Sequence, residues 1–303
     1  MSKLIVVLTC IFMLLFEQTD AQLPTVASGK IERYTDFTSA VIEPRNVDVW
    51  LPEGYSASKK YAVLYMHDGQ MLFDSSTTWN KQEWHVDETV SKLIAEGKIM
   101  DCIVVGIWNT GERRHADYFP QKPLSYLSEA VRDTLIKNEL AGKPRSDAYL
   151  QFIVSELKPF IDKTYSTYSD KAHTFIAGSS MGGLISMYAI CEYPEIFGGA
   201  ACISTHWPGS LQVEQNIIPD AFLKYLEQHL PSPADHKIYF DYGTITLDSL
   251  YKPHQLKINA VMKSKGYTQS KNWITKEFIG EPHTEIAWAK RLDIPLYFLL
   301  KKK

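Results

Sequence analysis

Short apolar runs alternate with segments of helical periodicity along most of this 303-residue chain. Most of these runs lack polar residues at alternate positions, so the strands they form would be buried on both faces. Such strands are typical of parallel sheets that helices cover on both sides. We predict strands at 47–51, 61–66, 103–107, 174–177, 199–203, 237–242 and 273–279, and helices at 86–95, 149–161, 184–190, 253–265 and from about 284. The sequence therefore predicts an α/β fold with a mostly parallel central sheet.

The composition predicts one large core and gives little reason to expect a nucleic-acid partner. Hydrophobic residues make up 45% of the chain and aromatic residues 12%. No repeat and no linker rich in Pro, Gly or Ser divides it, so we predict a single domain over residues 22–303. The formal charge is −3 and there is no basic stripe. Small molecules or neutral polymers are better candidate ligands than nucleic acid.

The first residues have the pattern of a secretory signal peptide. Lys3 precedes a mostly apolar run over 4–16, and the small residue Ala21 follows a short polar stretch. We predict a signal peptide over 1–21 and a secreted or periplasmic protein. The run is too short to span a bilayer, which needs about 20 residues. No membrane span is therefore expected.

The cysteines do not form a disulfide framework. After cleavage at residue 21, only Cys102, Cys191 and Cys202 remain, an odd and sparse set. Cys102 and Cys202 lie in apolar, strand-like runs, which favours buried thiols, with one disulfide as the alternative. No cluster of Cys and His has the spacing of a zinc site, so no metal is predicted.

The segment Gly178-Ser-Ser-Met-Gly182 fits the pattern Gly-x-Ser-x-Gly. It lies between a predicted buried strand and a predicted apolar helix. A sharp strand-to-helix turn needs small flanking residues and projects the serine hydroxyl above the sheet, at the positive end of the helix dipole. We therefore predict that Ser180 is a nucleophile.

In this arrangement an acid and then a base follow the serine along the chain. His283 comes directly after the last predicted strand, where a loop can bring its imidazole back to the serine. Asp248 lies in the loop after the preceding strand, whereas Asp241 lies within that strand. We predict His283 as the base and Asp248 as the acid, with Asp241 as the alternative acid.

A tetrahedral oxyanion needs two backbone N–H donors. We expect one from Met181, which follows the nucleophile, and one from the turn His67-Asp-Gly-Gln70, where the N–H of Gln70 is the best candidate. Two polar segments, 109–145 and 206–216, are expected to be loops at the carboxyl ends of strands, where such folds bind ligands.

The motifs together resemble the putative esterase family of α/β-hydrolases. The resemblance rests on Tyr65-Met-His-Asp-Gly-Gln-Met-Leu-Phe-Asp74, Gly178-Ser-Ser-Met-Gly-Gly183, Gly243-Thr244 and Glu281-Pro-His283, and it extends from about residue 40 to the C-terminus. It implies an α/β-hydrolase fold with an open sheet and no large cap domain. It also implies a Ser-His-Asp carboxylic ester hydrolase that needs no cofactor. Asp248 lies further beyond Thr244 than is typical of the family.

The resemblance also implies a substrate class. The family includes feruloyl and acetyl-xylan esterases, siderophore esterases and mycolyltransferases. Arg113 and Tyr118 lie in a segment similar to the family's loop beside the active site, and with Trp207 they are the predicted substrate contacts. We expect carbohydrate-linked acetyl or feruloyl esters as substrates. The alternatives are a siderophore lactone, acyl transfer to a sugar, or a non-catalytic binding module on the same fold.

Overall fold

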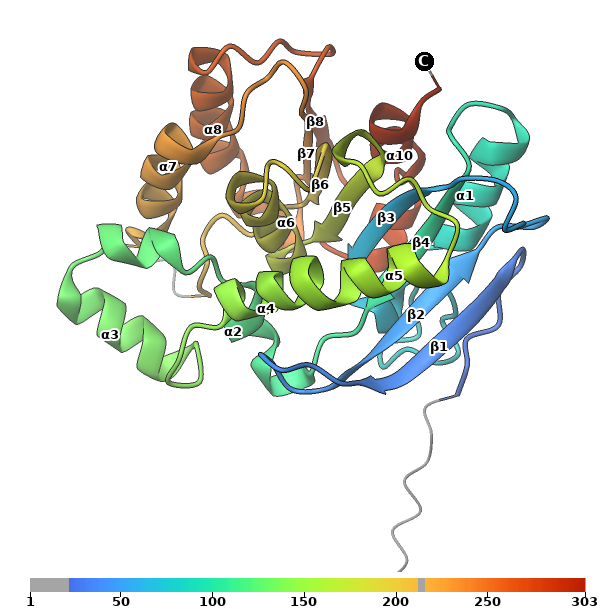
Figure 1. The fold of residues 1–303 in the computed structure, drawn as a ribbon. Helices are drawn as coiled ribbons and strands as arrows, with labels where there is room; N and C mark the ends of the chain where they lie inside the picture. The colour runs from blue at the N-terminus through green and yellow to red at the C-terminus, as the bar shows by residue number, and fades with distance from the viewer. Residues whose placement is uncertain (1–21, 212–215, 303) are drawn as a thin grey trace, which may run out of the picture.

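The computed structural model describes residues 22–211 and 216–302, so the predicted signal peptide lies outside the described residues. An eight-stranded sheet forms its centre (Figure 1). The strands are β1 (Lys30–Phe37), β2 (Arg45–Leu51), β3 (Ala62–His67), β4 (Cys102–Ile107), β5 (Thr174–Ser179), β6 (Gly199–Ile203), β7 (Lys237–Gly243) and β8 (Trp273–Phe278).

The strands lie in the order β1-β2-β4-β3-β5-β6-β7-β8. From β4 to β8 all neighbours are parallel, which confirms the predicted mostly parallel sheet. β1 and β2 are antiparallel to each other, and β2 is antiparallel to β4. Strand β1 was not predicted, because its sequence KIERYTDF is rich in charge and forms a partly exposed edge strand.

Helices cover both faces of the sheet, as predicted. Along β3, Val63 and Tyr65 belong to one buried cluster, while Leu64 and Met66 belong to the other. Helices α4 to α8 contribute to the first cluster, and α1, α9 and α10 contribute to the second. The helices are α1 (Val86–Ala95), α2 (Arg114–Tyr118), α3 (Glu129–Asn138), α4 (Ser146–Phe152), α5 (Lys158–Thr164), α6 (Met181–Glu192), α7 (Ile218–His229), α8 (Lys252–Ser264), α9 (Glu285–Ala289) and α10 (Asp293–Leu300).

Two segments differ from the prediction. The predicted loop 109–145 contains α2 and α3, and Figure 1 shows α3 at the edge of the molecule. Leu135 is the buried residue of α3, so this helix lacks the apolar stripe that would have identified it. The predicted helix 149–161 is divided by a π-helical turn, Ile153–Leu157. Pro159 lies two residues after this turn, and a proline cannot donate the backbone hydrogen bond that a continuous α-helix requires.

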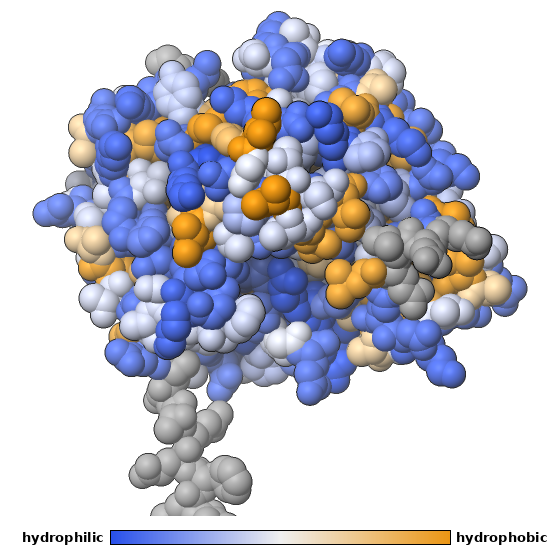
Figure 2. Space-filling view, turned by 180° about the vertical axis from the view of Figure 1, so that it is seen from behind, coloured by the Kyte–Doolittle hydropathy of each residue, from blue (hydrophilic) through white to orange (hydrophobic). Residues whose placement is uncertain are grey.

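The surface has no large hydrophobic patch on the face shown in Figure 2, and the described cysteines are buried. On the face shown in Figure 2, hydrophobic residues form small patches between hydrophilic ones. Cys102, Cys191 and Cys202 are free and buried, so the buried-thiol prediction is confirmed for them. Among the described residues, no helix combines the length and the apolar character needed to cross a membrane.

Candidate active site

Ser180 lies at the sharp turn between β5 and α6. Its backbone has φ 57° and ψ −122°, a strained conformation for a residue with a side chain. The Ser180 N–H donates to the carbonyl oxygen of Ile203 at 3.0 Å, which helps to hold the turn. At Gly178, an added Cβ would lie 2.8 Å from the backbone of Gly182. The small residues of the Gly-x-Ser-x-Gly segment are therefore needed for the close approach of strand and helix.

His283 and Asp248 are brought together by two loops that bind each other. The His283 Nδ1 and the Asp248 Oδ1 lie 2.5 Å apart. The backbone N–H of His283 donates to the Thr246 hydroxyl at 2.8 Å. At Gly243, an added Cβ would lie 2.0 Å from the carbonyl oxygen of Glu281. A glycine at the end of β7 thus lets the loop after β8 approach the loop that carries Asp248.

The Asp248 carboxylate is fully buried and has hydrogen bonds to both oxygens. Its Oδ2 accepts from the Gly243 N–H at 2.5 Å and from the Ser204 hydroxyl at 2.6 Å. Burial alone would raise the pKa of Asp248, but the bonds from His283, Ser204 and Gly243 outweigh it and hold the pKa below its usual value. Asp248 is therefore an ionised partner for the imidazole.

The alternative acid, Asp241, faces away from the imidazole. Its carboxylate accepts from Nε and one terminal nitrogen of Arg291, at 3.2 and 3.0 Å, and from the Tyr239 hydroxyl at 2.9 Å. Burial raises the pKa of Asp241, and the nearby Arg291 only partly offsets this. Arg291 also donates to the Ser204 hydroxyl at 2.9 Å. Asp241 is thus linked to Asp248 through Arg291 and the Ser204 hydroxyl.

Tyr251, which the sequence did not predict as a site residue, lies beside Ser180 and the ring of His283. The Tyr251 hydroxyl is 2.8 Å from the Nδ1 of His206 and also interacts with the Ser180 side chain. Its ring meets that of His283 edge-on, with centroids 5.8 Å apart. Burial raises the pKa of Tyr251, and the negative charge of Asp248 raises it further, so the phenol stays neutral. Burial also lowers the pKa of His206 to about 3.

The two predicted oxyanion donors lie at the start of helices. Met181 is the first residue of α6, and Gln70 belongs to the short 3-10 helix Gly69–Met71 after β3. The first N–H groups of a helix have no acceptor within it. The positive end of the α6 dipole points in the same direction as the Met181 N–H. The N–H groups of Met181 and Gln70 thus have no acceptor within their own helices.

Ser180 and His283 line one pocket of about 720 Å³, together with Gln70. Its other lining residues come from the segments after β3, β4 and β8 and from the end of β5, and most are polar or aromatic: Asp68, Met71, Trp79, Asn80, Gln82, Trp84, Asn109, Gly111, Arg114, Ser179, Thr284, Glu285 and Trp288. Within the described residues, no group of three or more His, Cys, Asp or Glu side chains is arranged to hold a metal ion.

The three predicted substrate contacts lie outside this pocket. Tyr118 is buried, and its hydroxyl accepts from the Asp68 N–H at 3.2 Å. Trp207 is buried, and its indole N–H donates to Gln255 at 2.8 Å. Arg113 is partly exposed and pairs with Glu43 at 3.3 Å. The neighbouring Arg114 lines the pocket instead.

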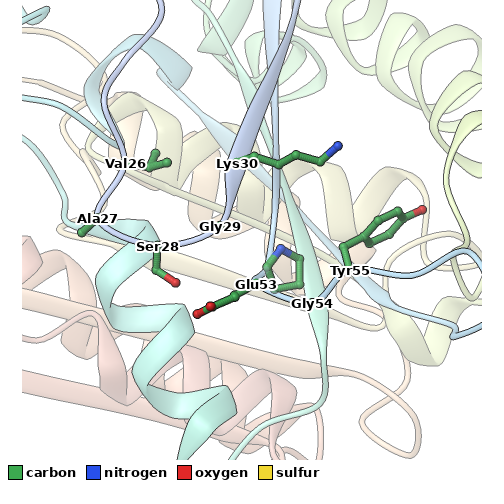
Figure 3. Close-up of a pocket in the computed structure, with 9 residues that line it drawn as sticks. Val26, Ala27, Ser28, Gly29, Lys30, Glu53, Gly54 and Tyr55 are labelled. Atoms are coloured by element: carbon green, nitrogen blue, oxygen red, sulfur yellow. The ribbon is translucent and has the colours of Figure 1, made fainter.

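A second hollow, of about 470 Å³, lies beside the start of β1 and the end of β2 (Figure 3). Its lining includes Ser28, Lys30, Glu53 and Tyr55. Figure 3 shows that these side chains do not converge on one point. This hollow shares no residue with the pocket of Ser180.

Residues 38–293 match the family described as "Putative esterase". An endo-1,4-beta-xylanase/feruloyl esterase from Xylanibacter ruminicola is 26% identical over 206 residues, which are 65% of this chain and 24% of that protein. A siderophore enterobactin esterase from Emericella nidulans is 28% identical over 162 residues, 51% of this chain and 50% of that protein. The chain thus spans half or less of the length of these two curated relatives.

The fold is also that of solved esterases. A ferulic acid esterase is similar in structure with a TM-score of 0.64 and 22% identity, over 89% of this chain and 98% of its own. At this identity the likeness shows the fold alone, an α/β-hydrolase fold with helices on both faces of the sheet. The family match covers most of the chain and includes Ser180, Asp248 and His283. This chain therefore belongs to the putative esterase family.

Proposed function

We propose that this chain is a serine carboxylic-ester hydrolase, with residues 22–303 acting as one catalytic domain. One observation carries the proposal. His283, bonded to the buried Asp248 at 2.5 Å, lines the same pocket as Ser180, which lies at a strained strand-to-helix turn. A nucleophile, a base and a carboxylate that orients the base are the groups that acyl transfer through a serine requires.

The reaction would proceed in two halves. The Nε2 of His283 takes the proton of the Ser180 hydroxyl as Oγ bonds to the ester carbonyl carbon. The N–H groups of Met181 and Gln70 donate to the resulting oxyanion, which then collapses and expels the alcohol. His283 gives its proton to the alcohol oxygen. Water, activated by the same imidazole, then releases the acid and restores the Ser180 hydroxyl.

Asp248 would hold the imidazole with Nδ1 protonated and Nε2 directed at the serine. It would also stabilise the imidazolium that forms when Ser180 loses its proton. The low pKa of Asp248 supports this role, because the carboxylate stays ionised throughout the reaction.

The favoured substrates are acetyl or feruloyl esters of carbohydrates. The polar and aromatic lining of the pocket suits a sugar ester. The names of two similar proteins, a xylanase/feruloyl esterase and a ferulic acid esterase, point the same way. A siderophore lactone is the second candidate, supported by the similarity to an enterobactin esterase.

We also propose that the protein is exported. The support is the sequence pattern of Lys3 and the apolar run 4–16. N-terminal sequencing of the protein from the medium or periplasm would then begin at Gln22. Recovery of the whole chain from the cytoplasm would contradict export.

Covalent labelling tests the assignment of the nucleophile. A fluorophosphonate reacts with an activated serine, so peptide mass spectrometry should find the adduct on Ser180 of the wild type. Ser180→Ala should remain unlabelled, whereas Ser58→Ala, at an exposed serine, should be labelled like the wild type. Labelling at another residue, or equal labelling of Ser180→Ala, would refute the assignment.

A further inference from the structure

Trp79 has an unusual position for a large aromatic residue. It lines the pocket of Ser180 and His283, yet 82% of its surface is exposed. Backbone hydrogen bonds hold the loop that carries Trp79. The Thr77 N–H donates to the Asp74 carbonyl oxygen at 3.1 Å, and the Trp84 N–H donates to Met71 at 3.1 Å. An exposed indole on a fixed loop is a preorganised contact surface, which costs little entropy on binding.

Trp79 lies on the imidazole side of the pocket. Its neighbour Asn80 donates from Nδ2 to the Oε2 of Glu285 at 3.0 Å. Glu285 follows His283 closely in the chain, and both line the same pocket. In ester hydrolysis the imidazole must reach the alcohol oxygen in order to protonate it. The alcohol part of the ester therefore lies on the side that Trp79, Asn80 and Glu285 form.

The part of the pocket lined by Arg114, Asp68 and Asn109 offers no unpaired charge for an anionic ligand. Arg114 lines the pocket, but its Nε and one terminal nitrogen donate to the two Asp68 oxygens, each at 2.7 Å. Asn109 donates to the same carboxylate at 2.7 Å. Asp68 lowers the net charge that a ligand would meet at this wall to about zero. A neutral ligand fits this pocket better than an anionic one.

The chemistry of the imidazole side suits a sugar ring. The weakly positive C–H hydrogens of a pyranose or furanose can pack on the negative face of an indole. Its hydroxyl groups can bond to the amide of Asn80 and the carboxylate of Glu285. We propose that Trp79, Asn80 and Glu285 form a subsite for the sugar that carries the esterified hydroxyl. This inference rests on the proposed hydrolysis of sugar esters, and adds the residues that hold the sugar and the direction in which the substrate binds.

Four esters that pair two acyl groups with two kinds of alcohol test the subsite. They are ethyl acetate, acetylated xylobiose, methyl ferulate and feruloyl arabinose. Trp79→Ala should lower kcat/KM for the two sugar esters by about tenfold more than for the two simple alkyl esters. The factor should be the same for both acyl groups. Trp79→Phe, which keeps an aromatic face, should retain most of the activity on sugar esters.

Tyr297→Ala is the matched control, because Tyr297 is an exposed aromatic residue on α10 that does not line the pocket. It should change none of the four rates. If Trp79→Ala affects methyl ferulate as much as feruloyl arabinose, the indole contacts the acyl group and the subsite is wrong. Equal rates of wild type and Trp79→Ala on all active esters refute the subsite alone. A wild type that hydrolyses none of the esters refutes the proposed function itself.

Discussion

Two buried carboxylates lie near His283, and only one of them bonds to it. Asp248 accepts from His283 Nδ1, while Asp241 is occupied by Arg291 and Tyr239. Ser204 donates to Asp248 and accepts from Arg291. Such a chain of hydrogen bonds fixes the direction of the carboxylate that orients the imidazole.

The two carboxylates should therefore respond differently to the same substitution. Asp248→Asn should lower kcat by a factor on the order of 10⁴, because the imidazole loses its orientation and the stabilisation of its charged form. Asp241→Asn should mainly lower the free energy of unfolding, by about 3 kcal/mol, because Arg291 loses the nearer of its two buried counter-charges, Asp241 at 3.0 Å, and keeps Asp248 at 3.9 Å. Steady-state kinetics and urea unfolding of both variants distinguish these roles. A larger loss of kcat in Asp241→Asn would reverse the assignment.

At the scale of elements, the site depends on the contact between the loops after β7 and β8. The loop that carries His283 donates two backbone hydrogen bonds to the loop after β7, one to the Thr244 hydroxyl at 2.7 Å and one to the Thr246 hydroxyl at 2.8 Å. The two loops also approach closely at Gly243. The position of His283 relative to Asp248 is therefore set by residues that do not line the pocket.

Gly243→Ala tests this dependence. The added Cβ would lie 2.0 Å from a backbone oxygen, so the loops must separate. We expect a loss of activity of at least about a hundredfold, since a 1 Å misplacement of reacting groups can have this effect. Gly54→Ala is the control for backbone strain alone. Its φ of 72° disfavours alanine, but an added Cβ there meets nothing within 4 Å, so this variant should lose stability without losing kcat. Undiminished kcat in Gly243→Ala would contradict the account.

The sequence predicts the elements that have strong periodicity and the residues that end them. Strand β5, the turn at Ser180 and the loop of His283 could be placed because apolar runs mark the strands on which they depend. Strand β1 and helix α3 could not, since charged edge elements lack such a pattern. Tyr251 was missed because only the folded chain places it beside Ser180.

The predicted substrate contacts also depended on tertiary packing, which the sequence pattern does not show. Tyr118 and Trp207 lie in polar segments, which suggested exposure, but tertiary packing buries both of them. Trp79 has no motif of its own, and its exposure at the pocket follows from the folding of residues 74–84 across the end of the sheet. Local pattern thus predicts the reacting groups better than it predicts the rim of the pocket.

At the scale of the whole molecule, two buried histidines should make the protein sensitive to acid. Burial lowers the pKa of His67 and of His206 to about 3. Between pH 6.5 and 3 the unfolded chain binds protons at these residues that the folded chain does not bind. The free energy of unfolding should therefore fall as the pH falls, by up to about 1.4 kcal/mol per pH unit for each histidine.

Urea unfolding between pH 7.5 and 5.5 tests this by comparing the wild type with His67→Gln. Asp87, whose pKa burial raises to about 7, titrates in the same range and contributes equally to both proteins. The wild type should lose stability toward pH 5.5, and His67→Gln should show a smaller slope with pH than the wild type. Equal slopes, or a gain of stability on acidification, would show that buried histidines do not control the response.

The most direct test of the central claim is the hydrolysis of p-nitrophenyl acetate by the mature protein and by Ser180→Ala. The account predicts turnover by the wild type and a loss of at least about 10³-fold in the variant, whose melting temperature should match that of the wild type. Release of p-nitrophenol at equal rates by both proteins would contradict the assignment of Ser180 as the nucleophile.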